Sequence, residues 1–470
     1  MRSHAFLLAA FLAPFAAAAA PGQAVEFRSP RGINEQCLSL ARMGGSYTKK
    51  DDKTESKLCA LDIYREEVAV CPKLWSTSAG TMLYGTTESG LSQAQYESTR
   101  CGVKKGHDKL AKFKTTMNQS GTSGTFAPSS LLYYHFSRYL QTIVQVPVSV
   151  YRSFDKDEHF ERVAKNAGGM GAMNKKAWEV LRAAEKNPAS YKPTRELITA
   201  DGKQIYGVLL DDGGGERYGA EINGIRSKWG DAQNNDFQNT PAYTALRSEK
   251  ALGSAIQEGI SSAKGAKMLG DLGQLPLGGV QMGLWMRELT EITLLDYIFN
   301  QQDRIGNIDY DWYWVFEKDG EVKAQKEKRE EFKDLARAKM KNITPPEDIA
   351  EYKPVLVQKS IIGDNDAGGR LQYVNYTKKT KMLEKIRHYD AGVYQRLQAL
   401  NADFAAKGAL YQHVKASFFL DDAQVNQIVK NTAEAAKILR DTCNAGKLRF
   451  DLDFNGLVRG NVTEARVNCQ

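Results

Sequence analysis

The stretch from Leu284 to Phe299 spaces its apolar side chains as a buried helix does and then runs directly into acidic residues. Asp303 and Arg304 follow the helical pattern, and Asn307 and Asp309 come just after them. A buried helix fixes part of a domain core. The polar residues at its end are therefore expected at an edge of that core.

A second acidic segment follows residues 355–362, which are predicted to form a strand with apolar residues at both ends. It contains Asp364, Asn365 and Asp366 and ends in Gly368 and Gly369. Each segment has a simpler interpretation, namely a helix-end acid paired with Arg304 and a polar turn. A calcium loop is a further alternative, but its twelfth position here is Asn375 instead of a glutamate.

Carboxylate and amide oxygens crowd both segments, and these are the ligands that Mg²⁺ and Mn²⁺ prefer. We therefore expect Asp364, Asp366, Asn307 and Asp309 as candidate metal ligands. The sequence contains no Walker A motif, no His-Glu-x-x-His and no Gly-x-Ser-x-Gly.

The remaining pattern predicts an α+β chain. Residues 110–117 alternate as a strand does, which places Lys112 and Lys114 on one face. A serine-capped helix is expected over 131–140, strands over 204–210 and 312–316, and helices from 381 to 439. Strands dominate the first half and helices the second, so we expect two lobes, a β-rich one followed by a mostly helical one.

The N-terminus predicts export. A basic start, a short apolar core and a run of alanines to Ala20 are typical of a secretory signal over residues 1–20. We expect a cysteine-bearing extension over 21–72, a first lobe over 73–212 and a second lobe with a C-terminal tail over 213–470. The protein is expected to be secreted or periplasmic, with no membrane span.

All six cysteines lie beyond the predicted signal. An even count without Cys-x-x-Cys favours disulfides in an oxidising compartment. Cys443 and Cys469 are expected to pair with each other. The other four cysteines could form two disulfides in three alternative ways; they are Cys37, Cys59, Cys71 and Cys101. Asn118, Asn342, Asn375 and Asn461 each begin an Asn-x-Ser/Thr sequon.

The formal net charge is +8, with 64 basic and 56 acidic residues, which suits an anionic ligand such as a nucleotide. Basic residues are scattered apart from a mixed run over 323–331. We interpret that run as a solvated helix face, and we expect no nucleic-acid partner.

The order of these pieces resembles the secretory-pathway kinases. The Lys-Phe-Lys114 strand, the helix 131–140, the strand 146–152, Gln-Asp303-Arg304 and Gly-Asp364-Asn365 occur in that group's order. The group includes the Golgi casein kinase, the xylosyl kinase and the spore-coat kinase CotH, and it is distantly similar to HipA and the phosphatidylinositol kinases. The resemblance covers residues 75–400.

The resemblance implies an atypical two-lobed kinase fold that uses ATP with Mn²⁺ or Mg²⁺ and transfers the γ-phosphoryl group to a hydroxyl of a protein or a glycan. It implies that Lys114, or Lys112, contacts the nucleotide phosphates. It implies that Asp303 accepts the proton of the acceptor hydroxyl and that Asp364 binds the metal ion.

Three departures keep a second hypothesis open, a secreted pseudokinase that acts as a scaffold or activator. The position expected for the second metal ligand is Ile308, the helix at Ser129–Ser130 lacks an acid to pair with the lysine, and Ser78–Gly80 is a weak phosphate loop. A protein with unrelated acidic turns is the third alternative.

Overall fold

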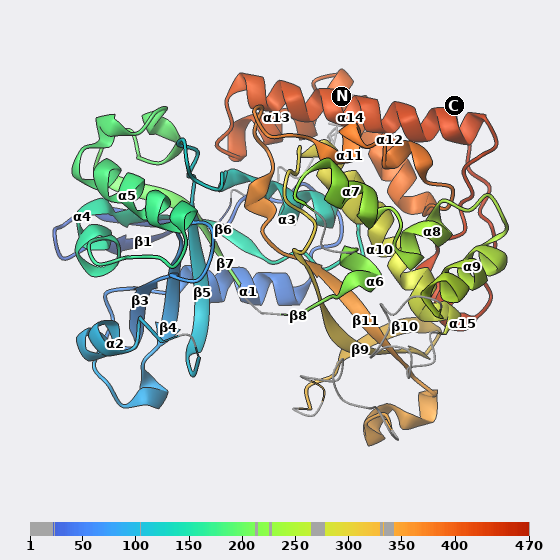
Figure 1. Ribbon diagram of the computed structural model, residues 1–470, viewed down its shortest axis with the longest axis horizontal. Helices are drawn as coiled ribbons and strands as arrows, with labels where there is room; N and C mark the ends of the chain where they lie inside the picture. The colour runs from blue at the N-terminus through green and yellow to red at the C-terminus, as the bar shows by residue number, and fades with distance from the viewer. Residues whose placement is uncertain are drawn as a thin grey trace, which may run out of the picture.

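The structure is a computed structural model that describes residues 22, 24–103, 105–211, 215–224, 228–264, 278–329, 332 and 343–469. The predicted signal over 1–20 lies outside these residues, and so does the sequon residue Asn342. The chain forms two halves (Figure 1), a sheet-rich N-terminal half and a helix-rich C-terminal half that carries a smaller sheet. The predicted α+β class, β-rich first and helical second, is confirmed.

The N-terminal half is built on a seven-stranded sheet in the order β1-β2-β6-β7-β5-β4-β3, in which every pairing is antiparallel. Its strands are β1 Ala24–Arg28, β2 Asn34–Leu38, β3 Val68–Pro72, β4 Thr81–Gly85, β5 Asp108–Thr115, β6 Ser149–Asp155 and β7 Gln204–Leu210. The segment 21–72, expected as an extension, therefore contributes three strands to this sheet. The domain boundaries themselves stay a prediction.

The predicted lysine strand is β5, which lies between β4 and β7. Lys114 pairs with Val208 and Lys112 with Leu210 along β7. Both lysines are buried. The interior position of β5 in the sheet thus fixes the backbone beneath both lysine side chains.

A helical body makes up most of the C-terminal half, with the buried helix α10 at its centre (Figure 1). The predicted helix 284–299 is confirmed as α10, which starts five residues earlier, at Gly279, and ends at Ile298. The helices of the chain are α1 Lys49–Cys59, α2 Gln93–Thr99, α3 Pro128–Leu140, α4 Lys156–His159, α5 Ala172–Lys186, α6 Ala220–Asn223, α7 Asp231–Phe237, α8 Pro241–Leu246, α9 Leu252–Lys264, α10 Gly279–Ile298, α11 Tyr376–Lys379, α12 Ala391–Ala405, α13 Ala409–Ser417, α14 Asp422–Asn444 and α15 Phe454–Arg459.

The smaller sheet orders its strands β10-β9-β11, with β8 also paired to β9. Its strands are β8 Glu216–Arg217, β9 Ile308–Lys318, β10 Glu321–Lys326 and β11 Val355–Ile362. β9 and β11 pair from Ile308↔Ile362 to Val315↔Val355. That pairing brings the chain after Asp303 next to the chain before Asp364.

Two local expectations are wrong. The helix α3 has no serine cap: it starts at Pro128 after Ala127, because proline is pre-organised for the first helical turn. The mixed-charge run at 323–331 begins as the hairpin strand β10, which pairs with β9, and not as a helix face.

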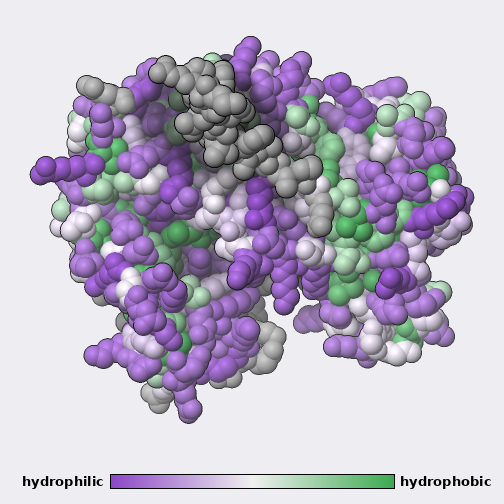
Figure 2. Space-filling view, turned by 180° about the vertical axis from the view of Figure 1, so that it is seen from behind, coloured by the Kyte–Doolittle hydropathy of each residue, from purple (hydrophilic) through white to green (hydrophobic). Residues whose placement is uncertain are grey.

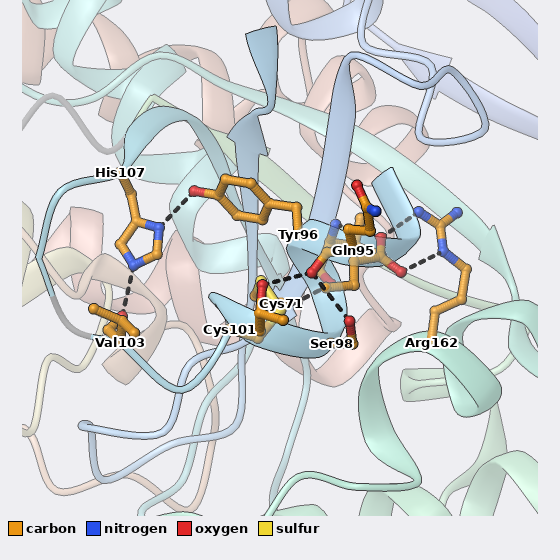
Figure 3. Close-up of a disulfide and its surroundings, with 11 residues drawn as sticks. Cys71, Gln95, Tyr96, Ser98, Cys101, Val103, His107 and Arg162 are labelled. Carbon is orange, nitrogen blue, oxygen red and sulfur yellow. Dashed lines mark hydrogen bonds and ion pairs between the residues drawn. A yellow bond between two sulfur atoms is a disulfide. The ribbon is translucent and has the colours of Figure 1, made fainter. Parts of the chain in front are cut away.

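Disulfides tie three pairs of segments, Cys37–Cys59, Cys71–Cys101 and Cys443–Cys469. The predicted tail pairing is confirmed. Around Cys71–Cys101, the Tyr96 hydroxyl meets His107 Nδ1 at 2.5 Å (Figure 3). Among the described residues, no helix combines the length and the apolar character that a membrane crossing requires.

Candidate functional site

Lys114 joins the two halves of the molecule through two ionic contacts, one partly buried and one buried. Its Nζ lies 2.7 Å from Asp364 Oδ1 and 2.6 Å from Asp366 Oδ1. Lys112 Nζ lies 3.7 Å from the same oxygen of Asp364. The structure thus brings together both lysines of the predicted strand and two of the predicted acids, across about 250 residues of sequence.

The acidic loop after β11 is held rigidly from several sides. The carbonyl of Asp366 accepts a hydrogen bond from the amide of Phe126 at 2.7 Å, and Gln302 N donates to the Ala367 carbonyl at 3.1 Å. A Cβ at Gly368 would lie 2.9 Å from the Phe299 carbonyl oxygen, which explains a glycine there. Asp364 itself is left-handed, at φ 45°, a conformation that aspartate tolerates better than most residues.

The charges of this cluster act strongly on one another. The ammonium of Lys114 lowers the pKa of Asp364 well below its ordinary value; burial opposes this effect, and the charges of Lys112 and Lys73 add to it. Burial lowers the pKa of Lys114, but Asp364 and Asp366 more than offset it and raise that pKa. Three lysines of the N-terminal half therefore act on one carboxylate, whose side chain is still 43% exposed.

Asp366 is the buried member of the cluster. Its side chain is 1% exposed, and its Oδ2 has no hydrogen-bond partner among the described residues. A buried carboxylate oxygen without a partner is costly unless a cation or a donor supplies one. In this structure Asp366 also provides the buried acid that the helix at Ser129–Ser130 lacks for Lys114.

Arg304 anchors the segment that carries Asp303. Its guanidinium binds the Asp296 carboxylate of α10, with Nε 3.0 Å from Oδ2. It also donates to the Gly363 carbonyl at 2.7 Å and to Asn365 Oδ1 at 2.9 Å. The interpretation of Asp303 as an acid paired with its neighbour is therefore wrong, because the partner of Arg304 is Asp296.

Asp303 is half-buried beside this frame. Its Oδ1 accepts a hydrogen bond from the indole nitrogen of Trp229 at 3.2 Å. Burial raises the pKa of Asp303, the Trp229 hydrogen bond opposes this, and the charges of Asp364 and Asp366 raise it further. A half-buried carboxylate whose pKa is raised suits a proton acceptor better than an ordinary surface acid does.

The remaining candidate ligands differ in their surroundings. Asn307 Nδ2 donates to the Asp303 carbonyl at 2.7 Å, and the Asn307 carbonyl accepts from Gly363 N at 3.0 Å. Asn307 therefore lies between the two acidic segments. Asp309 was expected in a loop but lies on β9, where its Oδ1 is 3.5 Å from Arg217 Nε.

Divalent-metal ligation is compatible with part of this set. Asp364 offers an exposed carboxylate, Asp366 an unpartnered oxygen, and both are the hard oxygen ligands that Mg²⁺ and Mn²⁺ take. In the described part of the chain, no group of three or more His, Cys, Asp or Glu side chains is already arranged as a metal site. The Lys114 ammonium is the cation that neutralises the two acids in this structure.

Comparison with known proteins finds similarity among solved structures. No protein-family model and no curated protein matches the chain. Among solved structures the chain is similar to the Golgi casein kinase in its Mn/ADP-bound crystal structure, with 12% sequence identity and a TM-score of 0.41. The match covers 84% of this chain and 77% of that one. The Golgi casein kinase belongs to the group that the sequence resembles. A similarity at this TM-score shows nothing about the activity of the chain.

Two neighbours of the site were not expected from the sequence, Trp229 and Asp296. Asp296 sits within the apolar helix pattern, where a polar residue at a buried position could have signalled a fixed ion pair. Trp229 lies 74 residues before its partner in a polar, glycine-rich segment, and no sequence signal connects the two.

Proposed function

We propose that this chain is an exported phosphotransferase that moves the γ-phosphoryl group of ATP to a hydroxyl with the help of a divalent cation. The observation that carries the proposal is the cluster of Lys112 and Lys114 with Asp364 and Asp366, next to the half-buried Asp303. Phosphoryl transfer needs positioned positive charge, a metal site and an acceptor for the hydroxyl proton, and little else.

Each residue has a defined role in this proposal. Lys114, with Lys112, neutralises phosphate oxygens. Asp364 and Asp366 would hold the Mn²⁺ or Mg²⁺ ion, with the carboxamide oxygen of Asn307 as a further ligand. When bound, the metal ion would neutralise charge on the phosphates.

The proposed phosphoryl transfer needs one general base, Asp303. The acceptor oxygen forms a bond to the γ-phosphorus as the bond from phosphorus to the β,γ-bridging oxygen breaks, and the hydroxyl proton passes to Asp303. ADP leaves with the electron pair of the broken bond. Arg304, the residue after Asp303, contributes by fixing this segment: its side chain is 5% exposed and is bonded to Asp296 of α10 and to Gly363 and Asn365 of the acidic loop.

Three further assignments belong to the proposal. Export rests on the predicted signal over 1–20, and the three disulfides support an oxidising compartment. The two lobes are proposed to divide near residue 212. Asp309 stays a candidate ligand near the start of β9, where its Oδ1 lies 3.5 Å from Arg217 Nε.

The proposal is tested by phosphoryl transfer from radiolabelled ATP with Mn²⁺, measured with hydroxyl acceptors and with water. Asp303→Asn should keep nucleotide binding and lose roughly 100-fold or more of the transfer rate. The matched control is Asp311→Asn, a carboxylate on β9 that pairs with Lys326. Nucleotide binding without transfer in the wild type would favour the pseudokinase, and absence of binding would overturn both hypotheses.

A further inference from the structure

The exposed indole of Trp229 is hydrogen-bonded to Asp303, the proposed proton acceptor. The residue is 56% exposed, yet its Nε1 donates to Asp303 Oδ1 at 3.2 Å. A tryptophan usually buries its ring because the ring is large and apolar. Here the indole N–H donates a hydrogen bond to the Asp303 carboxylate, while more than half of the residue is exposed to solvent.

The position of the ring is fixed by its neighbours. Tyr376 of α11 meets it edge-on, with centroids 5.5 Å apart and planes at 86°. Gly230, at φ 106°, turns the chain so closely over Tyr376 that a Cβ would lie 3.3 Å from its hydroxyl. Asp231 then pairs with Lys379 of α11 at 2.7 Å. The chain on the C-terminal side of Trp229 is thus tied to α11.

We propose that Trp229 is the acceptor-positioning residue of the site and that the acceptor is a sugar ring of a glycan. The inference rests on the proposed phosphotransferase function. A pyranose has an apolar C–H face that can lie on the indole, while its hydroxyls project from the ring edge. One such hydroxyl would then reach Asp303, whose carboxylate the indole N–H holds in place.

The charges around the indole favour a neutral acceptor over an acidic peptide. Asp303 lies at the indole N–H, and the charges of Asp364 and Asp366 act on Asp303. An acidic peptide would meet these carboxylates with like charge. A neutral sugar meets them with hydroxyl donors, and it needs only the ring face and one carboxylate to be oriented.

Binding of methyl glycosides of five common pyranoses tests the proposal without turnover, by ligand-observed NMR of the full chain with ADP and Mg²⁺, which is diamagnetic. We expect at least one glycoside to bind, with its C–H face closest to the protein. Trp229→Ala should weaken that binding about tenfold, and Trp229→Phe should keep most of it because the ring remains. Phe419→Ala is the matched control, since Phe419 is 42% exposed but stacks on Tyr151 instead.

Transfer kinetics separate the two roles of the ring. Trp229→Ala should raise KM for the glycoside, whereas Trp229→Phe should lower kcat with little change in KM, because only the N–H to Asp303 is lost. A wild-type protein that binds Mg²⁺–ADP but no glycoside, or that transfers only to serine peptides, overturns the sugar assignment. Equal glycoside binding by Trp229→Ala overturns the role of Trp229, and failure to bind the nucleotide shows that the proposed function itself is wrong.

Discussion

Single residues decide the chemistry proposed for this chain. Lys114 and Asp366 are both nearly inaccessible to water, and each is the other's partner at 2.6 Å. Removing one member of a buried ion pair leaves an uncompensated charge, which costs more than the pair itself contributes. The same two residues should therefore dominate both stability and nucleotide binding.

Lys114→Met should lower the free energy of unfolding by about 3–5 kcal/mol, because Asp366 loses its buried partner. The pair Lys114→Met with Asp366→Leu should recover most of that loss. Urea unfolding of the wild type and these two variants measures the effect, and Lys326→Met is the control, since its pair with Asp311 is more exposed. A double variant as unstable as Lys114→Met would contradict this account of the pair.

Sequence reasoning found residues but not their partners. Asp303 and Asp364 could be selected because each follows a strongly patterned element, whereas the strand pattern selected Lys112 and Lys114 together and only the family resemblance favoured Lys114. The partners of Lys114 and Arg304 could not, because those contacts depend on how distant segments pack. Lys114 meets a carboxylate 252 residues away, and Arg304 meets Asp296 within an otherwise apolar helix.

At the scale of elements, prediction succeeded where an apolar run had clear ends. The strands 204–210 and 355–362 were predicted to the residue, because apolar residues fill most positions of each run and a polar turn follows it. β1 was missed because its five residues are all exposed or half-buried, so no buried face marks it. Asp309 was placed in a loop because the pairing of β9 with β11 from Ile308 onward is a long-range contact.

The helix α3 carries a buried histidine that should make stability depend on pH. Burial lowers the pKa of His135 to about 3; the charges of His413, Arg138 and Arg42 add to this, and Asp51 opposes it. The folded protein therefore keeps His135 neutral while the unfolded chain binds a proton below its ordinary pKa. The free energy of unfolding should fall as pH drops from about 6.5 toward 3, by up to ~1.4 kcal/mol per pH unit.

Urea unfolding between pH 7 and pH 4.5 measures this slope. His135→Gln should reduce it, because this variant has no imidazole at the buried position. An unaltered slope in His135→Gln would show that other groups cause the dependence.

Two disulfides close loops of similar length, 30 residues for Cys71–Cys101 and 26 for Cys443–Cys469. If each stabilises by restricting the unfolded chain, replacing either pair with serines should cost about 3–4 kcal/mol, nearly equally. Denaturant unfolding of the two double variants measures this. A difference of more than about 1 kcal/mol would mean that local contacts, such as those in Figure 3, dominate instead.

At the scale of the whole molecule, the surface seen from behind is largely hydrophilic, with a notch between the two halves (Figure 2). Not every sequon lies freely on that surface. Asn118 Nδ2 donates to the Thr125 carbonyl at 2.9 Å, and Asn375 Nδ2 donates to the Tyr297 carbonyl at 2.8 Å. Asn461 is exposed.

Expression in a glycosylating host should therefore modify Asn461 in preference to Asn118 and Asn375, whose amides are already bonded. Mass spectrometry of peptides after enzymatic deglycosylation gives the occupancy of each site. Full occupancy at Asn118 in a folded protein would contradict the packing described for that loop.

The whole-molecule order of pairing could not be predicted from the sequence. In the strand order β1-β2-β6-β7-β5-β4-β3 the pairings β2-β6 and β5-β7 join strands that are not consecutive along the chain, so local pattern does not encode the order. The hydrophobic pattern did indicate how strands and helices are distributed along the chain, and therefore the two halves of the molecule. The ion pair of Lys114 with Asp364 joins these two halves.

The most direct test of the central claim is the thermal unfolding midpoint of the oxidised protein with ATP alone, Mn²⁺ alone and both together. Binding to the native state at 100 times Kd adds about 2.7 kcal/mol of stability. We expect a rise that needs both ligands, persists in Asp311→Asn and disappears in Asp364→Asn. The same rise in Asp364→Asn as in the wild type, or no rise in the wild type, would contradict the account.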